Sequence, residues 1–132
     1  MSSKTSIILC TYNEANHVKN AIFELEKNIP DVEIVIVDDS SSDGTAEIIK
    51  KINQNNKYKV VFRKKSRNLA SAFVRGLTET TGANIGWIDT NMGELASKFP
   101  EMSNELKSDN DLILMSRYVK GGGDNRIFVR AF

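Results

Sequence analysis

Polar residues that could bind a charged ligand follow several apolar runs of this sequence. The run "NIGWID" leads into Asp89, Thr90 and Asn91, so one carboxylate and one amide oxygen stand two residues apart. Mg²⁺ and Mn²⁺ prefer hard oxygen ligands of this kind, so the stretch could hold a divalent metal. An ordinary strand end has the same appearance. Three other apolar runs end in "TYNE" (Thr11–Glu14), "DDSS" (Asp38–Ser41) and "SRY" (Ser116–Tyr118).

Each of these stretches also has a plain structural interpretation. In "DDSSSDGT", Ser and Asp are common helix caps and Gly supplies a turn. Asn13 and Glu14 would equally suit a helix entry, because Asn can cap the first turn and an acidic residue is favoured there. The basic run "RKKSR" (Arg63–Arg67) is typical of a solvated loop. The run Gly121–Gly123 lacks the Gly-Lys-Ser/Thr ending of a phosphate-binding P-loop.

The counts of histidine and cysteine exclude several kinds of active site. One histidine, His17, cannot form a Ser-His-Asp or Cys-His set, and we expect it on the surface of a helix. One cysteine, Cys10, allows neither an internal disulfide nor a zinc cluster. Cys10 and Trp87 lie in strand patterns, which predicts both for the core. The first strand is followed by "TYNEAN" and not by a glycine-rich turn, so a dinucleotide site is not expected.

Short runs of Val, Ile and Leu alternate with helical patterns along the chain. The predicted strands are Thr5–Thr11, Glu33–Asp39, Tyr58–Phe62, Asn84–Asp89 and Asp111–Ser116. Apolar residues at helical spacing predict helices around Val18–Leu25, Ile48–Ile52, Leu69–Leu77 and Phe99–Leu106. This alternation predicts an α/β fold with a mostly parallel sheet and helices on both faces. Right-handed crossovers put the carboxyl ends of the strands on one edge, where the polar stretches above would form one crevice.

The composition suits one soluble domain or a part of a larger one. The chain has 132 residues, of which 40% are hydrophobic and 27% charged, and its net charge is +1. This balance gives no reason to expect nucleic acid as a partner. A single cysteine, no apolar run of bilayer length and no signal-peptide pattern lead us to expect a cytoplasmic protein. After "RYVKGGGDN" a new segment, "RIFVRAF", begins, so we expect the chain to be truncated within a larger fold.

Five stretches, taken in order, resemble one enzyme family. They are "SIILCTYNEANHV", "EIVIVDDSSSDGT", "RNLASAFVRGL", "TGANIGWIDTN" and "DLILMSRYVKGGG". Together they resemble the inverting, nucleotide-sugar-dependent glycosyltransferases of family 2, closest to the polyprenol-phosphate sugar synthases of the dolichyl-phosphate mannosyltransferase type. The resemblance implies the Rossmann-like GT-A fold of nucleotide-diphospho-sugar transferases. Residues 1–132 would form the donor-binding, N-terminal portion of such a domain.

The resemblance further implies which residues would hold the nucleotide. Tyr12, Glu14 and the backbone of Cys10 would line the nucleotide pocket. Val37 and Asp39 would hold the base and ribose side. The donor would be a GDP-sugar or a UDP-sugar, because the spacing of the motifs does not distinguish the two bases.

The phosphate end of the site is implied in the same way. Asp89, Thr90 and Asn91 occupy the family's acid-x-acid position, where Asp89 and Asn91 would present Mg²⁺ or Mn²⁺ to the donor diphosphate. Arg117 would lie near the phosphates. Asp89 and Arg117 would be the catalytic residues, because the departing diphosphate develops negative charge that a metal and an arginine neutralise.

The sequence departs from the family pattern at four positions. Asn91 stands where a second acidic residue is usual, and Gly93 stands where the closest relatives carry a Gln that assists the metal. Cys10 replaces a usual Pro, and Asn68 replaces a usual Gly. An amide is a weaker metal ligand than a carboxylate, so we expect a weakened metal site.

The expected function is transfer of a sugar to a polyprenyl phosphate with inversion at the anomeric carbon. Two alternatives remain: a nucleotide-binding or regulatory module without catalysis, and a related transferase whose acceptor is a glycan or a protein. For the full-length protein the resemblance implies peripheral association with the inner face of a membrane. An exposed sheet edge could also promote homo-oligomers.

Overall fold

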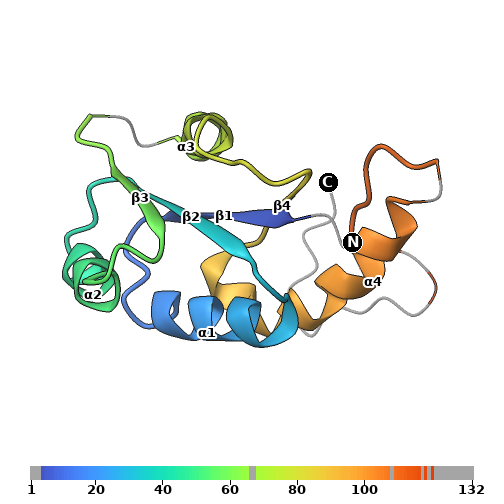
Figure 1. Ribbon diagram of the computed structural model, residues 1–132. Helices are drawn as coiled ribbons and strands as arrows, with labels where there is room; N and C mark the ends of the chain where they lie inside the picture. The colour runs from blue at the N-terminus through green and yellow to red at the C-terminus, as the bar shows by residue number, and fades with distance from the viewer. Residues whose placement is uncertain (1–3, 66–67, 108, 117, 119, 121–132) are drawn as a thin grey trace.

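The computed structural model describes residues 4–65, 68–107, 109–116, 118 and 120. Its centre is a parallel sheet in the order β3-β2-β1-β4 (Figure 1). The strands are β1 (Thr5–Thr11), β2 (Glu33–Asp38), β3 (Lys59–Phe62) and β4 (Asn84–Trp87). The predicted parallel α/β sheet is confirmed, with β1 and β2 in its middle.

Helices cover both faces of this sheet, as the alternating pattern predicts. Helix α3 (Leu69–Leu77) lies on one face (Figure 1). The other face carries α1 (Val18–Asn28), α2 (Thr45–Ile52), the 3-10 segment η1 (Thr90–Lys98) and α4 (Phe99–Glu105). Within the described residues no helix is long and apolar enough to cross a bilayer.

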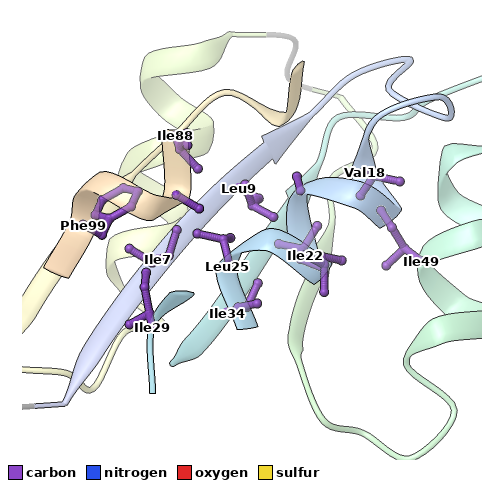
Figure 2. Packing of buried hydrophobic residues seen from close by; sticks show 13 residues of the cluster. Ile7, Leu9, Val18, Ile22, Leu25, Ile29, Ile34, Ile49, Ile88 and Phe99 are labelled. Atoms are coloured by element: carbon purple, nitrogen blue, oxygen red, sulfur yellow. The ribbon is translucent and has the colours of Figure 1, made fainter. Parts of the chain in front are cut away.

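The central strands are buried on both sides, and alternate residues serve different cores. On the α1 side, Ile7 and Leu9 of β1 pack with Leu25 of α1 (Figure 2). On the α3 side, Ile8 of β1 packs with Val37 of β2 and with Ala72 of α3. Since successive side chains of a strand point to opposite faces, the continuous apolar runs follow directly from this double burial.

Helix α3 approaches the sheet closely because of one glycine. A Cβ atom added to Gly76 would lie 2.6 Å from Cγ2 of Ile8, which is too short for any contact between carbon atoms. Glycine at this position therefore sets the depth at which α3 sits on β1, and with it the position of the helix's amino end above the carboxyl edge of the sheet.

Three predicted features differ from the structure. Asp111–Ser116 forms no strand within the described part of the chain, because a strand requires a hydrogen-bonded neighbour and β1 is the only strand that pairs with β4 there. Trp87 is 42% exposed and not in the core, since it lies on β4 at the edge of the described sheet, where Phe73 stacks against it edge-on. The strand predicted at Asn84–Asp89 ends at Trp87, and the segment after Asp89 is helical (η1).

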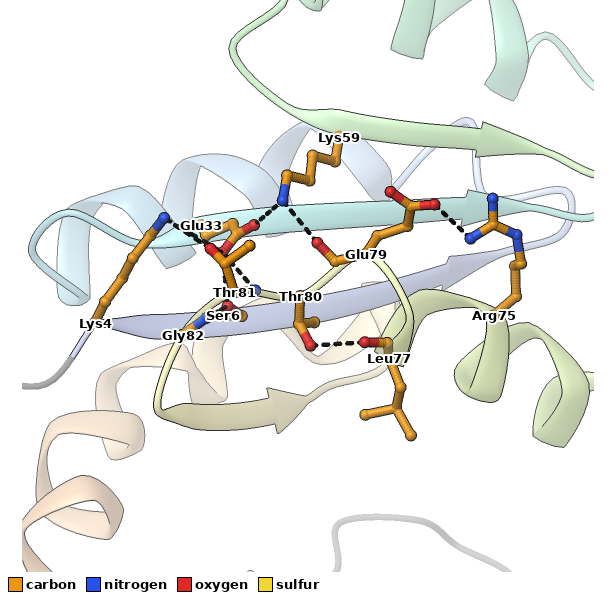
Figure 3. A network of polar contacts seen from close by, with 10 residues as sticks. All are labelled: Lys4, Ser6, Glu33, Lys59, Arg75, Leu77, Glu79, Thr80, Thr81 and Gly82. Atoms are coloured by element: carbon orange, nitrogen blue, oxygen red, sulfur yellow. Dashed lines mark hydrogen bonds and ion pairs between the residues drawn. The ribbon is translucent and has the colours of Figure 1, made fainter.

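A charged network joins the strands at the amino-terminal edge of the sheet (Figure 3). Glu33 of β2, whose side chain is 8% exposed, accepts hydrogen bonds from Ser6 Oγ (2.8 Å) and Thr81 Oγ1 (2.6 Å). Its carboxylate also lies 2.6 Å from Nζ of Lys59 and 3.4 Å from Nζ of Lys4. One carboxylate therefore fastens β1, β2, β3 and the connection between α3 and β4.

We expect this network to make the stability of the protein depend on acid. Burial raises the pKa of Glu33, but the hydrogen bonds from Lys59, Thr81 and Ser6 outweigh it and lower the pKa from 4.5 to about 2. The ionised carboxylate therefore stabilises the fold above pH 4.5, and this contribution is lost as the pH falls through 4.5 towards 2. Glu33→Gln should cost about 2 kcal/mol of unfolding free energy at pH 7.

Urea unfolding of both proteins at several pH values would check this prediction. The difference between wild type and Glu33→Gln should shrink between pH 4.5 and pH 2, because a protonated glutamate resembles glutamine. A difference that stays constant over that range would contradict it.

Candidate functional site

A pocket of about 400 Å³ opens at the carboxyl edge of the sheet, and we call it the edge pocket. Its walls come from the end of β1, the residue after β2, the amino end of α3 and the residues after β4. The lining residues are Cys10, Thr11, Tyr12, Glu14, Asp39, Asn68, Leu69, Ala72 and Asp89. The crevice that the strand ends predict is thus present as one cavity.

Of the predicted site residues that the structure describes, five lie in this pocket and three lie elsewhere. Cys10, Tyr12, Glu14, Asp39 and Asp89 line the pocket. Val37 is fully buried between the sheet and α3, and Thr90 is buried at the start of η1. Asn91 is exposed and is not part of the wall. Arg117 lies outside the described residues.

Asp38 locks together the two loops that carry the site. Its side chain is almost completely buried, and its Oδ1 accepts hydrogen bonds from Thr11 Oγ1 (2.7 Å) and Ser41 Oγ (2.6 Å). Its Oδ2 accepts from the Ser41 backbone N–H (3.1 Å). Asp38 itself does not line the edge pocket, so its role is to shape the strand ends that do.

Further hydrogen bonds connect the "TYNE" loop to the "DDSSSDGT" loop. Asn13 N–H donates to Ser41 Oγ (2.9 Å), and Asn13 Oδ1 accepts from Ser42 N–H (2.9 Å). Asp43 accepts from the N–H groups of Ala15 and Thr45, both at 3.0 Å. The hydrogen bond from the Thr45 hydroxyl is the main reason why the pKa of Asp43 is lowered.

Both interpretations of these two stretches therefore hold in part. Asp43 accepts a hydrogen bond from the N–H of Thr45, the first residue of α2, while Asp39 of the same motif lines the pocket. The carbonyl oxygen of Glu14 accepts from the N–H groups of His17 and Val18, so "TYNE" leads into α1. Its side chains at Tyr12 and Glu14 still face the pocket. His17 is exposed at the start of α1, as predicted.

Arg63 was expected in a solvated loop, and this prediction is wrong, because its side chain is only 13% exposed. It pairs with Asp39 through Nε, and Arg63 Nη2 donates to Asp39 Oδ2 at 2.6 Å. The parallel register sets Asp38 opposite Phe62, so the next two residues, Asp39 and Arg63, face each other just beyond the paired strands. An arginine directly after the strand that neighbours "VDD" was the signal that could have revealed this pair.

The Cys10 thiol is not a nucleophile at neutral pH. Burial raises its pKa, and the nearby Asp39 carboxylate raises it further, so that it reaches about 11. A thiol with this pKa stays protonated, and only the thiolate reacts readily. Cys10 therefore contributes a neutral wall to the pocket.

Asp89 supplies a carboxylate to the wall of the edge pocket next to the end of β4. It stands at the first position before η1, it is exposed, and its side chain makes no capping hydrogen bond. Within the described ranges no group of three or more His, Cys, Asp or Glu side chains could hold a metal ion. One carboxylate and one nearby amide still fit Mg²⁺ or Mn²⁺ when substrate phosphates supply further ligands, since such ions often bind in that way.

Gly93 has a structural role that the sequence pattern does not reveal. A Cβ atom at this position would lie 3.0 Å from Cα of Ala21, so η1 packs directly against the backbone of α1. Position 93 therefore faces α1 and not the edge pocket. A glutamine placed here would have to displace α1 before it could reach a metal ion.

Comparison with known proteins agrees with this geometry. The model of "Glycosyl transferase family 2" matches residues 6–131. The dolichol-phosphate mannosyltransferase of Pyrococcus furiosus is 32% identical over 90% of this chain and 34% of its own length. The cholesterol galactosyltransferase of Borreliella burgdorferi is 28% identical over 87% of this chain and 32% of its own length. The chain thus spans about a third of these relatives.

A solved structure shows the same fold. The mannosyltransferase of Pyrobaculum calidifontis, in complex with GDP-Man and Mn²⁺, superposes with a TM-score of 0.60 and is 25% identical. The superposition covers 69% of this chain and 28% of that one. The predicted GT-A fold is thereby confirmed. With the family match over almost its whole length, the chain belongs to glycosyl transferase family 2.

Proposed function

We propose that the protein transfers a sugar from a nucleotide-diphosphate donor and that the edge pocket binds this donor. The observation that carries the proposal is the meeting of Tyr12, Glu14, Asp39 and Asp89 in one pocket, although they come from three separate parts of the chain. The solved relative was obtained with GDP-Man and Mn²⁺, which supports a nucleotide-sugar and a divalent metal as ligands.

The roles of the pocket residues follow from their chemistry. Asp39, held by Arg63, accepts hydrogen bonds from the base, and the exposed Tyr12 ring packs against a planar or sugar surface. Asp89 would face the diphosphate end. Asn91 and Arg117 are assigned to that end by the resemblance to the family alone. A metal ion bound there would neutralise the charge that develops on the departing diphosphate.

The transfer itself needs no general base when the acceptor is a phosphate. An oxygen of the acceptor phosphate forms the new bond to the anomeric carbon, while the bond from that carbon to the donor diphosphate breaks. The nucleoside diphosphate leaves with the bonding electrons, and attack from the opposite side inverts the configuration. This chemistry agrees with a pocket whose cysteine is protonated and which contains no histidine among its lining residues.

We assign the acceptor to the polyprenyl phosphates. The relative with 32% identity is a dolichol-phosphate mannosyltransferase, which supports this choice. The cholesterol galactosyltransferase among the relatives makes a sterol the main alternative. A polyprenyl phosphate resides in a membrane, so the full-length protein would act from the cytoplasm at the inner membrane face.

Two measurements on the full-length protein test the proposal. Isothermal titration with GDP-mannose and UDP-glucose, with and without Mn²⁺, should show micromolar to millimolar binding of at least one donor. Radiolabelled sugar should then pass to a polyprenyl phosphate in preference to cholesterol. Absence of binding to both donors would overturn the donor-site assignment, and binding without any transfer would instead favour a regulatory nucleotide-binding module.

A further inference from the structure

Arg63 lies outside the pocket wall, but several contacts hold its side chain against Asp39. The guanidinium contacts both oxygens of Asp39, and the two side chains are only 13% and 7% exposed. Arg63 Nη1 also donates to Ser71 Oγ (2.9 Å), and Nη2 donates to the carbonyl oxygen of Asn68 (3.1 Å). The arginine thereby joins the end of β2 to the amino end of α3.

The backbone of Arg63 is held as firmly as its side chain. Its N–H donates to the carbonyl oxygen of Asp38 at 2.8 Å, and its carbonyl oxygen accepts from Ser40 Oγ. The hydrogen bonds with Asp39 raise the pKa of Arg63, so the guanidinium stays charged. A buried ion pair of this kind often contributes little net stability compared with apolar packing, so we expect its net contribution to the unfolding free energy to be small.

The geometry shows what the pair can do for a ligand. Asp39 lines the edge pocket, whereas Arg63 does not. The planar fork of an arginine fixes a carboxylate in plane and orientation. Each carboxylate oxygen can accept more than one hydrogen bond, so Asp39 can bind Arg63 and still accept from a ligand in the pocket.

We propose that Arg63 is a positioning residue for nucleobase recognition, which fixes Asp39 so that the pocket selects bases with a ring N–H. The proposal rests on the proposed donor-binding function. Uracil presents N3–H and guanine presents N1–H, both of which donate to a carboxylate. Cytosine and adenine carry an unprotonated ring nitrogen at the corresponding position, so acceptor would meet acceptor. An unmet buried acceptor is costly, which gives the selection its strength.

The test compares four nucleoside diphosphates on the full-length protein: UDP with CDP, and GDP with ADP. Isothermal titration in the presence of Mn²⁺ should show at least one of two preferences in the wild type. Either UDP binds roughly tenfold more tightly than CDP, or GDP binds roughly tenfold more tightly than ADP. In Arg63→Gln this ratio should fall towards one, because the affinity for the favoured base drops while that for CDP and ADP stays the same. Arg63→Lys, which keeps the charge without the fork, should give an intermediate ratio.

Arg75→Gln is the matched control. Arg75 lies on α3 and forms an ion pair with Glu79, but it is not part of the edge pocket. This variant should keep the wild-type ratio. If Arg63→Gln fails to fold, Ser71→Ala removes one anchor of the guanidinium and should lower the ratio in the same direction, though by less.

The outcomes separate the inference from the proposed function. If the wild type binds none of the four nucleotides, the donor-binding function itself fails. If it binds them without preference, or if Arg63→Gln weakens all four equally, Arg63 has a merely structural role and the inference is wrong. An unchanged ratio in Arg63→Gln and Arg63→Lys would overturn it as well.

Discussion

Replacing Asp89 with alanine is expected to lower the rate of sugar transfer by at least about 100-fold, because it removes the pocket carboxylate that we propose for the diphosphate end of the donor. The same change should abolish the part of donor affinity that depends on Mn²⁺. Asp89 makes no capping hydrogen bond and is exposed, so the substitution should leave the unfolding free energy nearly unchanged. Transfer kinetics and titration with and without Mn²⁺ measure both effects.

Two further variants sharpen this prediction. Asn91→Asp places a second carboxylate two residues from the first and should strengthen the Mn²⁺-dependent affinity. Glu101→Ala removes an exposed carboxylate of α4, away from the pocket, and serves as the control. An equal response to Mn²⁺ in the wild type, Asp89→Ala and Asn91→Asp would contradict the assignment of Asp89 as a metal ligand.

Asp38→Ala is expected to destabilise the protein by about 3–5 kcal/mol, although Asp38 never touches the pocket. The change leaves the buried hydroxyl of Thr11 without its acceptor and frees Ser41, which also holds Asn13. Urea unfolding measures the loss of stability. Titration with whichever nucleotide-sugar the wild type binds should also show weaker binding to Asp38→Ala, since both loops of the site depend on this carboxylate.

Asp38→Asn is the informative companion variant. The amide keeps one oxygen acceptor but has no negative charge. The unfolding free energy of Asp38→Asn should therefore lie between that of the wild type and that of Asp38→Ala. Full stability in both variants would show that the loops are held by other contacts and would refute the role assigned to Asp38.

The fold was largely predictable because burial leaves a clear pattern in the sequence. Ile7, Ile8 and Leu9 face two different cores in turn, which makes β1 a continuous apolar run. The parallel topology follows from the alternation of such runs with amphipathic helices. Because parallel strands share one carboxyl edge, the meeting of Tyr12, Asp39 and Asp89 could also be predicted from the sequence.

The remaining features depend on contacts that are distant in the sequence. The strand predicted at Asp111–Ser116 has the right composition, but composition does not supply a neighbour to pair with. Trp87 looks like a core residue until its strand proves to be the edge of the described sheet. The pairing of Arg63 with Asp39 depends on the register of β2 and β3, and the role of Gly93 depends on how closely η1 meets α1.

The hydrogen bonds between the "TYNE" and "DDSSSDGT" loops have a consequence for the thermodynamics of binding. Asn13 and Ser40 both hold left-handed backbone conformations, with φ values of 54° and 55°, which are uncommon for residues other than glycine. The bonds among Asn13, Asp38 and Ser41 keep these loops in that shape without any ligand. Their conformational entropy is therefore lost when the chain folds, so an incoming nucleotide meets a preorganised surface and loses little of its interaction free energy in ordering it.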